Sequence, residues 1–189
     1  MKKLAAGLVA VLALAMSACV DAPQRPIETV TPVPLPGDTV EPPATASRTP
    51  SQEELSAQAE QAYRAFFNEW KRLEFLGGAD EPTPTLLENG AGKYLEGVML
   101  FLRDQKSTGY VVQGEMPTAT VVPRPGEAEL GSDPRLTLAV CEDSRSSWHT
   151  DSRGRHEGTL SQGLAYVNIV DGRMKVVWAN TEVVQACAL

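Results

Sequence analysis

Five side chains are the candidates for acid–base catalysis or metal binding in this sequence: Tyr63, Asp143, His149, Asp151 and His156. A carboxyl or imidazole group does acid–base work only where its surroundings adjust its pKa, which usually means burial in a pocket. The five are not arranged in a catalytic pattern, because the sequence contains no phosphate-binding glycine loop, nucleophile elbow or HExxH pair. We therefore expect no catalytic residue set and no cofactor, so that binding is favoured over catalysis.

Each candidate also has an ordinary structural role. Tyr63 lies on an apolar helix stripe, which predicts a core residue whose hydroxyl bonds to backbone or water. Asp143 follows a strand, where capping or turn formation is the usual role of Asp. His149 and His156 are seven positions apart, without CxxC or HxxxH spacing, and this disfavours a metal site.

Residues 144–158 are rich in Ser, Arg, Asp and Gly, which indicates an exposed loop. A competing hypothesis is a contact patch in this segment. An aromatic ring with several guanidinium groups nearby could hold an anionic group by stacking and by paired hydrogen bonds. The patch would comprise Arg145, Trp148, His149, Arg153 and Arg155.

The first residues are typical of an export signal. Lys2 and Lys3 precede an apolar run too short to cross a bilayer, and Ser17, Ala18 and Cys19 follow it. The segment 16–19 resembles the lipobox of bacterial lipoproteins, although Met16 stands where Leu is usual. The resemblance implies that residues 1–18 are removed and that Cys19 is acylated, which would attach the protein to a membrane at the extracytoplasmic face. Secretion with a spare cysteine is the alternative.

Residues 19–50 are predicted to be a disordered tether. Eight of the 14 prolines lie between Val20 and Pro50, with no hydrophobic period, and this composition favours extended polyproline II. The remaining residues, 51–189, suffice for a single domain. A peptide-recognition motif at 32–36 is the less favoured alternative.

Two cysteines remain if Cys19 is acylated. Outside the cytoplasm an even number of cysteines favours a disulfide, so Cys141 and Cys187 are expected to be bonded.

The elements follow from hydrophobic periodicity. Thr49 as the N-cap and Pro50 in the first turn predict the start of a long helix, whose apolar residues recur at spacings of three and four until Gly77–Gly78. Two shorter helices are expected at 85–89 and 92–105, closed by Gly109. Strands are expected at 110–113, 119–122, 136–142, 160–170 and 174–187, and Asp171–Gly172 predicts a type I′ hairpin.

This order of helices followed by strands predicts an α+β fold with a cavity between sheet and helices. Trp70 and Trp178 are placed on core faces, with pocket lining as a second role for both and for Tyr63.

The helix-then-sheet order resembles the NTF2-like, or SnoaL-like, cone fold. The segment 136–144 (LTLAVCEDS), Trp148, the hairpin ending at Trp178 and the terminal Cys187 resemble exported NTF2-like lipoproteins of actinobacteria. Over residues 51–189 the resemblance implies three N-terminal helices packed on a curved antiparallel sheet, and a disulfide between the Cys-x-Asp-Ser strand and the C-terminus. Segment 143–158 departs from the family pattern.

The charge composition limits the classes of molecule that the protein can bind. With 17 Lys and Arg against 24 Asp and Glu, a net charge of −7 and no run of three basic residues, nucleic acid is excluded as a partner. We expect a non-catalytic domain that binds a cell-envelope protein or a small apolar ligand, and a homodimer is possible. The alternatives are a SnoaL-type isomerase or hydrolase using Tyr63 and one acid from the sheet, and a phage- or prophage-encoded lipoprotein for superinfection exclusion.

Overall fold

A capping box starts the first helix. The computed structural model describes residues 49–125 and 136–189, and helix α1 comprises Gln52–Phe75. The expectation that Thr49 caps this helix is wrong. Ser51 is the N-cap, since its Oγ accepts a hydrogen bond from the Glu54 amide (3.2 Å) while the Glu54 carboxylate accepts one from the Ser51 amide (2.7 Å). The expected signal segment, Cys19 and the tether up to residue 48 lie outside the described residues.

Two further helices follow close to their expected positions. Helix α2 (Pro84–Asn89) is capped by Thr83, and α3 (Gly92–Thr108) ends at Gly109, whose φ of 75° is the left-handed conformation that glycine adopts without strain. The apolar periodicity of α1 and α3 is confirmed, because Ala59, Tyr63 and Phe66 are buried on α1, as are Val98 and Leu102 on α3. No helix in the described part of the chain is long and apolar enough to span a membrane.

The larger sheet contains four antiparallel strands in the order β2-β3-β6-β7. They are β2 (Thr118–Arg124), β3 (Leu136–Asp143), β6 (Leu160–Val170) and β7 (Arg173–Val183). Asp171 and Gly172 both have positive φ, 53° and 75°, as a type I′ turn requires, and the predicted β6–β7 hairpin is confirmed. The last strand ends at Val183 rather than at Cys187.

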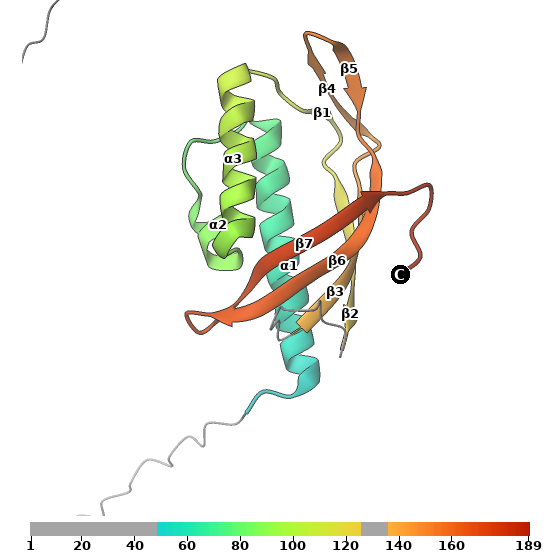
Figure 1. The fold of residues 1–189 in the computed structure, drawn as a ribbon. Coiled ribbons are helices and arrows are strands. Elements are labelled where there is room, and N and C mark those ends of the chain that lie inside the picture. Colours follow the sequence, from blue (N-terminus) through green and yellow to red (C-terminus); the bar gives the residue numbers. More distant parts are fainter. Residues whose placement is uncertain (1–48, 126–135) are drawn as a thin grey trace, which may run out of the picture. The chain divides into compact units, whose positions relative to one another are not determined.

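A second, smaller sheet has the order β1-β4-β5. Strands β4 (Ser147–Asp151) and β5 (Gly154–Glu157) form a hairpin, and β1 (Gln113–Gly114) pairs with β4. The strand expected at 110–113 is therefore reduced to two residues and does not join the larger sheet. Figure 1 shows the β4–β5 hairpin and the N-terminal end of α1 at opposite ends of the described domain.

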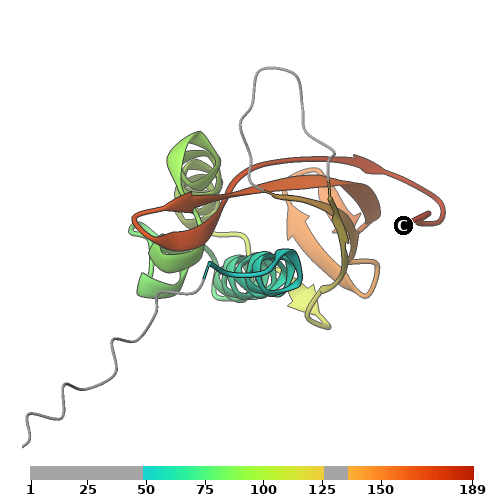
Figure 2. The same cartoon turned by 90° about the horizontal axis from the view of Figure 1, so that it is seen from below.

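The predicted α+β class is confirmed: helices pack on antiparallel sheets. Figure 2 shows the four-stranded sheet curving around α1. The space between them is filled by side chains, since Tyr63, Phe66 and Phe67 are each only 1% exposed and pack in one cluster with Leu138 and Val140 of β3. Because this interior is packed, the expected cavity between α1 and the sheet is occupied by the protein itself.

Trp178 does not face the core, contrary to the expectation. A β-bulge between Tyr166 and Val167 shifts the register of β6 and β7, so that one extra residue of β7 lies between the pairs Val167–Val176 and Tyr166–Trp178. Alternation is thereby displaced by one position, and Ala179 instead packs against the core. The indole of Trp178 is left 47% exposed.

Candidate functional site

The segment expected to be an exposed loop, 144–158, is mostly the β4–β5 hairpin. His149 lies directly opposite His156, and Asp151 lies opposite Gly154. Side chains alternate between the faces of a strand, so His149 and Asp151 share one face with His156, while Trp148 and Arg155 lie on the other. Both histidines are half-buried rather than on an open surface loop.

Three rings are stacked on the histidine face. The Tyr110 ring lies 4.6 Å from the His149 ring, and the His149 and His156 rings are 4.9 Å apart and inclined by 18°. His156 Nε2 lies 2.9 Å from Asp151 Oδ1. The hydrogen bond with His156, helped by those from the Arg153 amide and guanidinium, holds the pKa of Asp151 well below its usual range. Asp151 is therefore an ionised carboxylate between a histidine and an arginine.

The residues of the hypothetical contact patch do not share one surface. Arg145, Arg153 and Arg155 are each paired with a carboxylate two positions away in the chain, namely Asp143, Asp151 and Glu157. The Arg155 guanidinium also lies 4.2 Å from the Trp148 ring. Because the arginines have carboxylate partners and the side chains lie on two faces, these residues do not form one anion-binding surface.

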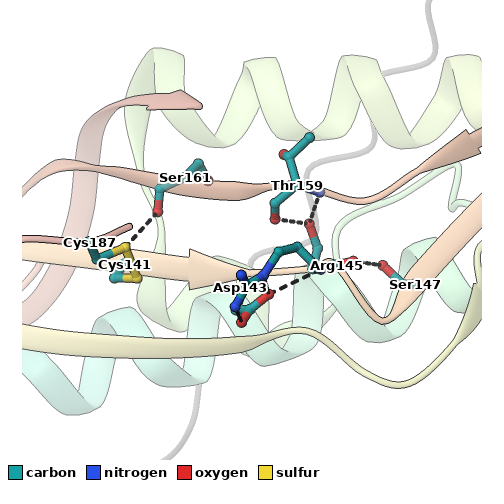
Figure 3. A network of polar contacts seen from close by, with 8 residues as sticks. Cys141, Asp143, Arg145, Ser147, Thr159, Ser161 and Cys187 are labelled. Atoms are coloured by element: carbon teal, nitrogen blue, oxygen red, sulfur yellow. Dashed lines mark hydrogen bonds and ion pairs between the residues drawn. A yellow bond between two sulfur atoms is a disulfide. The ribbon is translucent and has the colours of Figure 1, made fainter. Parts of the chain in front are cut away.

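The Asp143 side chain has the turn-forming role that the sequence predicts. Its Oδ1 accepts a hydrogen bond from the Arg145 amide (3.1 Å), and the Arg145 guanidinium lowers the pKa of Asp143 to about 2. Figure 3 shows the Asp143–Arg145 pair beside Ser147 and Thr159. The Ser144 hydroxyl donates to the Thr159 carbonyl (2.8 Å), which ties the β3–β4 turn to the start of β6, and the Ser147 hydroxyl donates to the Ser144 carbonyl (2.7 Å) within the turn. Figure 3 also shows the Cys141–Cys187 disulfide, which the structure contains as expected, with a Cα–Cα distance of 6.1 Å.

Tyr63 is paired with an acid of the sheet, Glu142, which was not singled out from the sequence. Its hydroxyl donates to Glu142 Oε1 at 2.5 Å, rather than to backbone or water. Burial first, and then the negative charge of Glu142, raise the pKa of Tyr63 far above its ordinary value, so the phenol stays protonated and acts as a donor. A periodic signal could have identified Glu142, because it continues the inward-facing row Leu136, Leu138 and Val140.

A buried acid lies near the C-terminal end of α1. Burial raises the pKa of Glu74, and the ammonium group of Lys71, 3.1 Å away, opposes that shift. Lys71 Nζ also lies 3.9 Å from the Trp70 ring, which is half-buried and meets Phe101 edge-on. A buried carboxylate near aromatic rings was not expected, because only apolar residues were followed along the helix, although Glu74 comes four positions after Trp70 and continues the same buried stripe.

A pocket of about 220 Å³ opens at this end of the domain, between α1, α3 and the β4–β5 hairpin. Its walls include Lys71, Glu74, Tyr110, Trp148 and His149. It therefore combines charged groups with aromatic rings, as ligand-binding pockets commonly do. Tyr63, Trp70 and Trp178, which were expected to line a pocket, are not in its walls.

The fold and the site define an α+β domain with a polar and aromatic pocket at its hairpin end. Comparison of the chain with protein-family models, with curated proteins and with solved structures finds no match.

Proposed function

We propose that this chain is a lipid-anchored extracytoplasmic protein whose NTF2-like, cone-shaped domain binds a partner in the cell envelope without catalysing a reaction. The main observation in support of this proposal is the packed interior between α1 and the sheet. A small apolar ligand would need the space that Tyr63, Phe66 and Phe67 fill, and we therefore assign partner binding to a surface outside the core. The lipobox-like segment at Cys19 supports the anchor, and the curved sheet around α1, with the Cys141–Cys187 disulfide, supports the resemblance to actinobacterial NTF2-like lipoproteins.

The β4–β5 end of the domain is the surface that we assign to the partner. The proposed tether joins the domain at Ser51, at the opposite end of α1 from the hairpin (Figure 1). Helix α1 has 24 residues and is thus about 36 Å long, at 1.5 Å per residue. Because the chain segment that leads to Cys19 joins the domain at the other end of α1, attachment through that segment does not involve the hairpin or its pocket, and we take this end as the surface presented to a partner.

Acyl attachment at Cys19 is directly testable. We expect the full chain expressed in a bacterium that processes lipoproteins to be recovered from the membrane fraction, beginning at residue 19. Its intact mass should exceed that of the polypeptide by the mass of its acyl chains. A Cys19→Ala variant should incorporate no labelled fatty acid, while Ser17→Ala should leave labelling unchanged because the cysteine is retained. An unacylated parent chain would refute the anchor.

Partner binding at the hairpin can be tested by site-specific photocrosslinking in intact cells. A benzoylphenylalanine at Thr150, an exposed position of β4, should give a discrete crosslinked product with an envelope protein. The matched control carries the same probe at Gln61, an exposed position of α1, and should give none. Equal products from both positions, or none from Thr150, would contradict the proposed surface.

Acid–base catalysis is the second candidate function. The observation that favours it is the pairing of Tyr63 with Glu142, because a phenol and a carboxyl group in an apolar interior is the pair that an isomerase or hydrolase of this kind would use. The two groups are hydrogen-bonded to each other, and neither lines the 220 Å³ pocket. Binding is therefore the function that the geometry supports better.

A further inference from the structure

The two histidines of the chain lie opposite each other on one face of a hairpin, with an aspartate beside them. We propose that His149, Asp151 and His156 form a binding site for a divalent transition-metal ion of the zinc class. One ligand atom from each residue, a ring nitrogen or a carboxylate oxygen, lies within 4.8 Å of the others. A site of this kind is separate from the proposed partner-binding role, which requires no metal.

The backbone brings the three groups together although the spacing in the sequence is irregular. His149 and Asp151 are two positions apart on β4, so their side chains project from the same face. His156 is the cross-strand neighbour of His149, and side chains at such positions lie within a few ångströms of each other. The HxxxH and CxxC spacings, whose absence from the sequence disfavours a metal, are not needed in a β-hairpin, where strand pairing brings distant positions together.

The ligand chemistry indicates the class of metal. Two imidazoles with one carboxylate are a donor set of borderline softness, which suits Zn²⁺, Co²⁺, Ni²⁺ or Cu²⁺ better than Ca²⁺ or Mg²⁺. The 2.9 Å between His156 Nε2 and Asp151 Oδ1 is compatible with both atoms binding one ion, since zinc bonds to N and O are about 2.0–2.2 Å long. Binding would replace their present hydrogen bond, with any proton on Nε2 released to solvent.

Neighbouring groups hold the ligands in place. The Tyr110 ring packs on His149, and the Arg153 amide donates to Asp151 Oδ1 at 2.7 Å while its guanidinium bonds Oδ2 at 2.9 Å. Such outer contacts fix the orientation of metal ligands. A pocket of about 550 Å³, whose walls include Tyr110, Asp151 and Arg153, adjoins the cluster and gives solvent access. Three protein ligands and an open side would leave at least one coordination position for water or another ligand.

Metal binding at this cluster can be tested directly because the chain contains only two histidines and three cysteines. The full chain with Cys19→Ser, its disulfide intact and without a polyhistidine tag, has no free thiol and no imidazole other than those of His149 and His156. We expect Co²⁺ to bind with a stoichiometry of one and to produce ligand-field absorption bands. Zn²⁺ should displace it and shift the NMR signals of both histidine rings.

Substitutions at the ligands should weaken binding. We expect His156→Ala and Asp151→Asn each to raise the Kd for Co²⁺ at least about tenfold, since even second-shell changes cost about 10–100-fold. Glu157→Gln is the matched control, because Glu157 follows His156 on β5 but lies on the other face of the hairpin and pairs with Arg155. The Kd of this variant for Co²⁺ should equal that of the parent. The site is refuted if Zn²⁺ leaves both histidine signals of the parent unshifted. It is also refuted if Asp151→Asn and His156→Ala, with circular dichroism unchanged, bind Co²⁺ as tightly as the parent.

Discussion

Removal of the Cys141–Cys187 disulfide is expected to lower the free energy of unfolding by about 4 kcal/mol. The bond joins residues 46 positions apart, and in the chain-entropy model a closed loop of this length restricts the unfolded chain by about that amount. This is a large fraction of the roughly 5–15 kcal/mol by which ordinary domains are stable. The bond attaches the segment after β7 to β3, immediately beside Glu142.

Urea unfolding of a Cys141→Ala/Cys187→Ala variant, compared with the parent chain, measures this loss. The parent should lose a similar amount when reductant is added, whereas the variant should not respond to reductant at all. Contacts other than the disulfide also hold the C-terminal segment, since the Val184 amide donates to the Leu160 carbonyl and the Ala188 amide donates to the Gln162 side chain. A loss below about 1 kcal/mol would show that these contacts suffice, and the loop-entropy account would fail.

Truncation of Phe66 should be comparably damaging. Phe66 is 1% exposed, lies 5.4 Å from the Tyr94 ring, and packs so closely on Gly90 that a Cβ added there would lie 2.2 Å from its Cε2 atom. Replacement of such a side chain by alanine removes its burial and leaves a cavity, at a cost of about 3–5 kcal/mol. We therefore expect Phe66→Ala to lower the urea midpoint strongly.

The matched control for Phe66→Ala is Leu100→Ala on α3, a large apolar side chain that is 69% exposed. Its removal should change the free energy of unfolding by no more than about 0.5 kcal/mol. If Phe66→Ala cost as little as Leu100→Ala, the interior between α1 and the sheet would not be packed. A ligand could then enter that interior, and the binding surface would not have to lie outside the core.

The sequence predicts most of the fold because its strongest signals are local. The stripe on α1 and the Asp171–Gly172 turn are each encoded within a few residues, and the structure confirms both. The β4–β5 hairpin was missed because both of its faces are polar, so that no apolar alternation distinguishes it from a loop. Cross-strand pairs such as His149–His156, which hold it together, depend on register and cannot be recognised from composition.

The candidate site was only partly predictable for a similar reason. The bond between Tyr63 and Glu142 joins residues 79 positions apart, and no local pattern records such a contact. Trp178 was misplaced because a single bulge inverts alternation for the rest of a strand. His149 and Asp151 were recognised as chemically capable residues, but their assembly with His156 depends on a strand pairing that the sequence did not indicate.

The division of the strands into two sheets has a consequence for evolution. The β4–β5 hairpin shares no ladder of hydrogen bonds with the β2-β3-β6-β7 sheet, where most of the buried core residues on strands lie. Substitutions on the hairpin are therefore constrained by local pairing, whereas substitutions in the larger sheet affect the stability of the domain as a whole. Specificity at the hairpin end can diverge between descendants of this protein while the scaffold that displays it is retained.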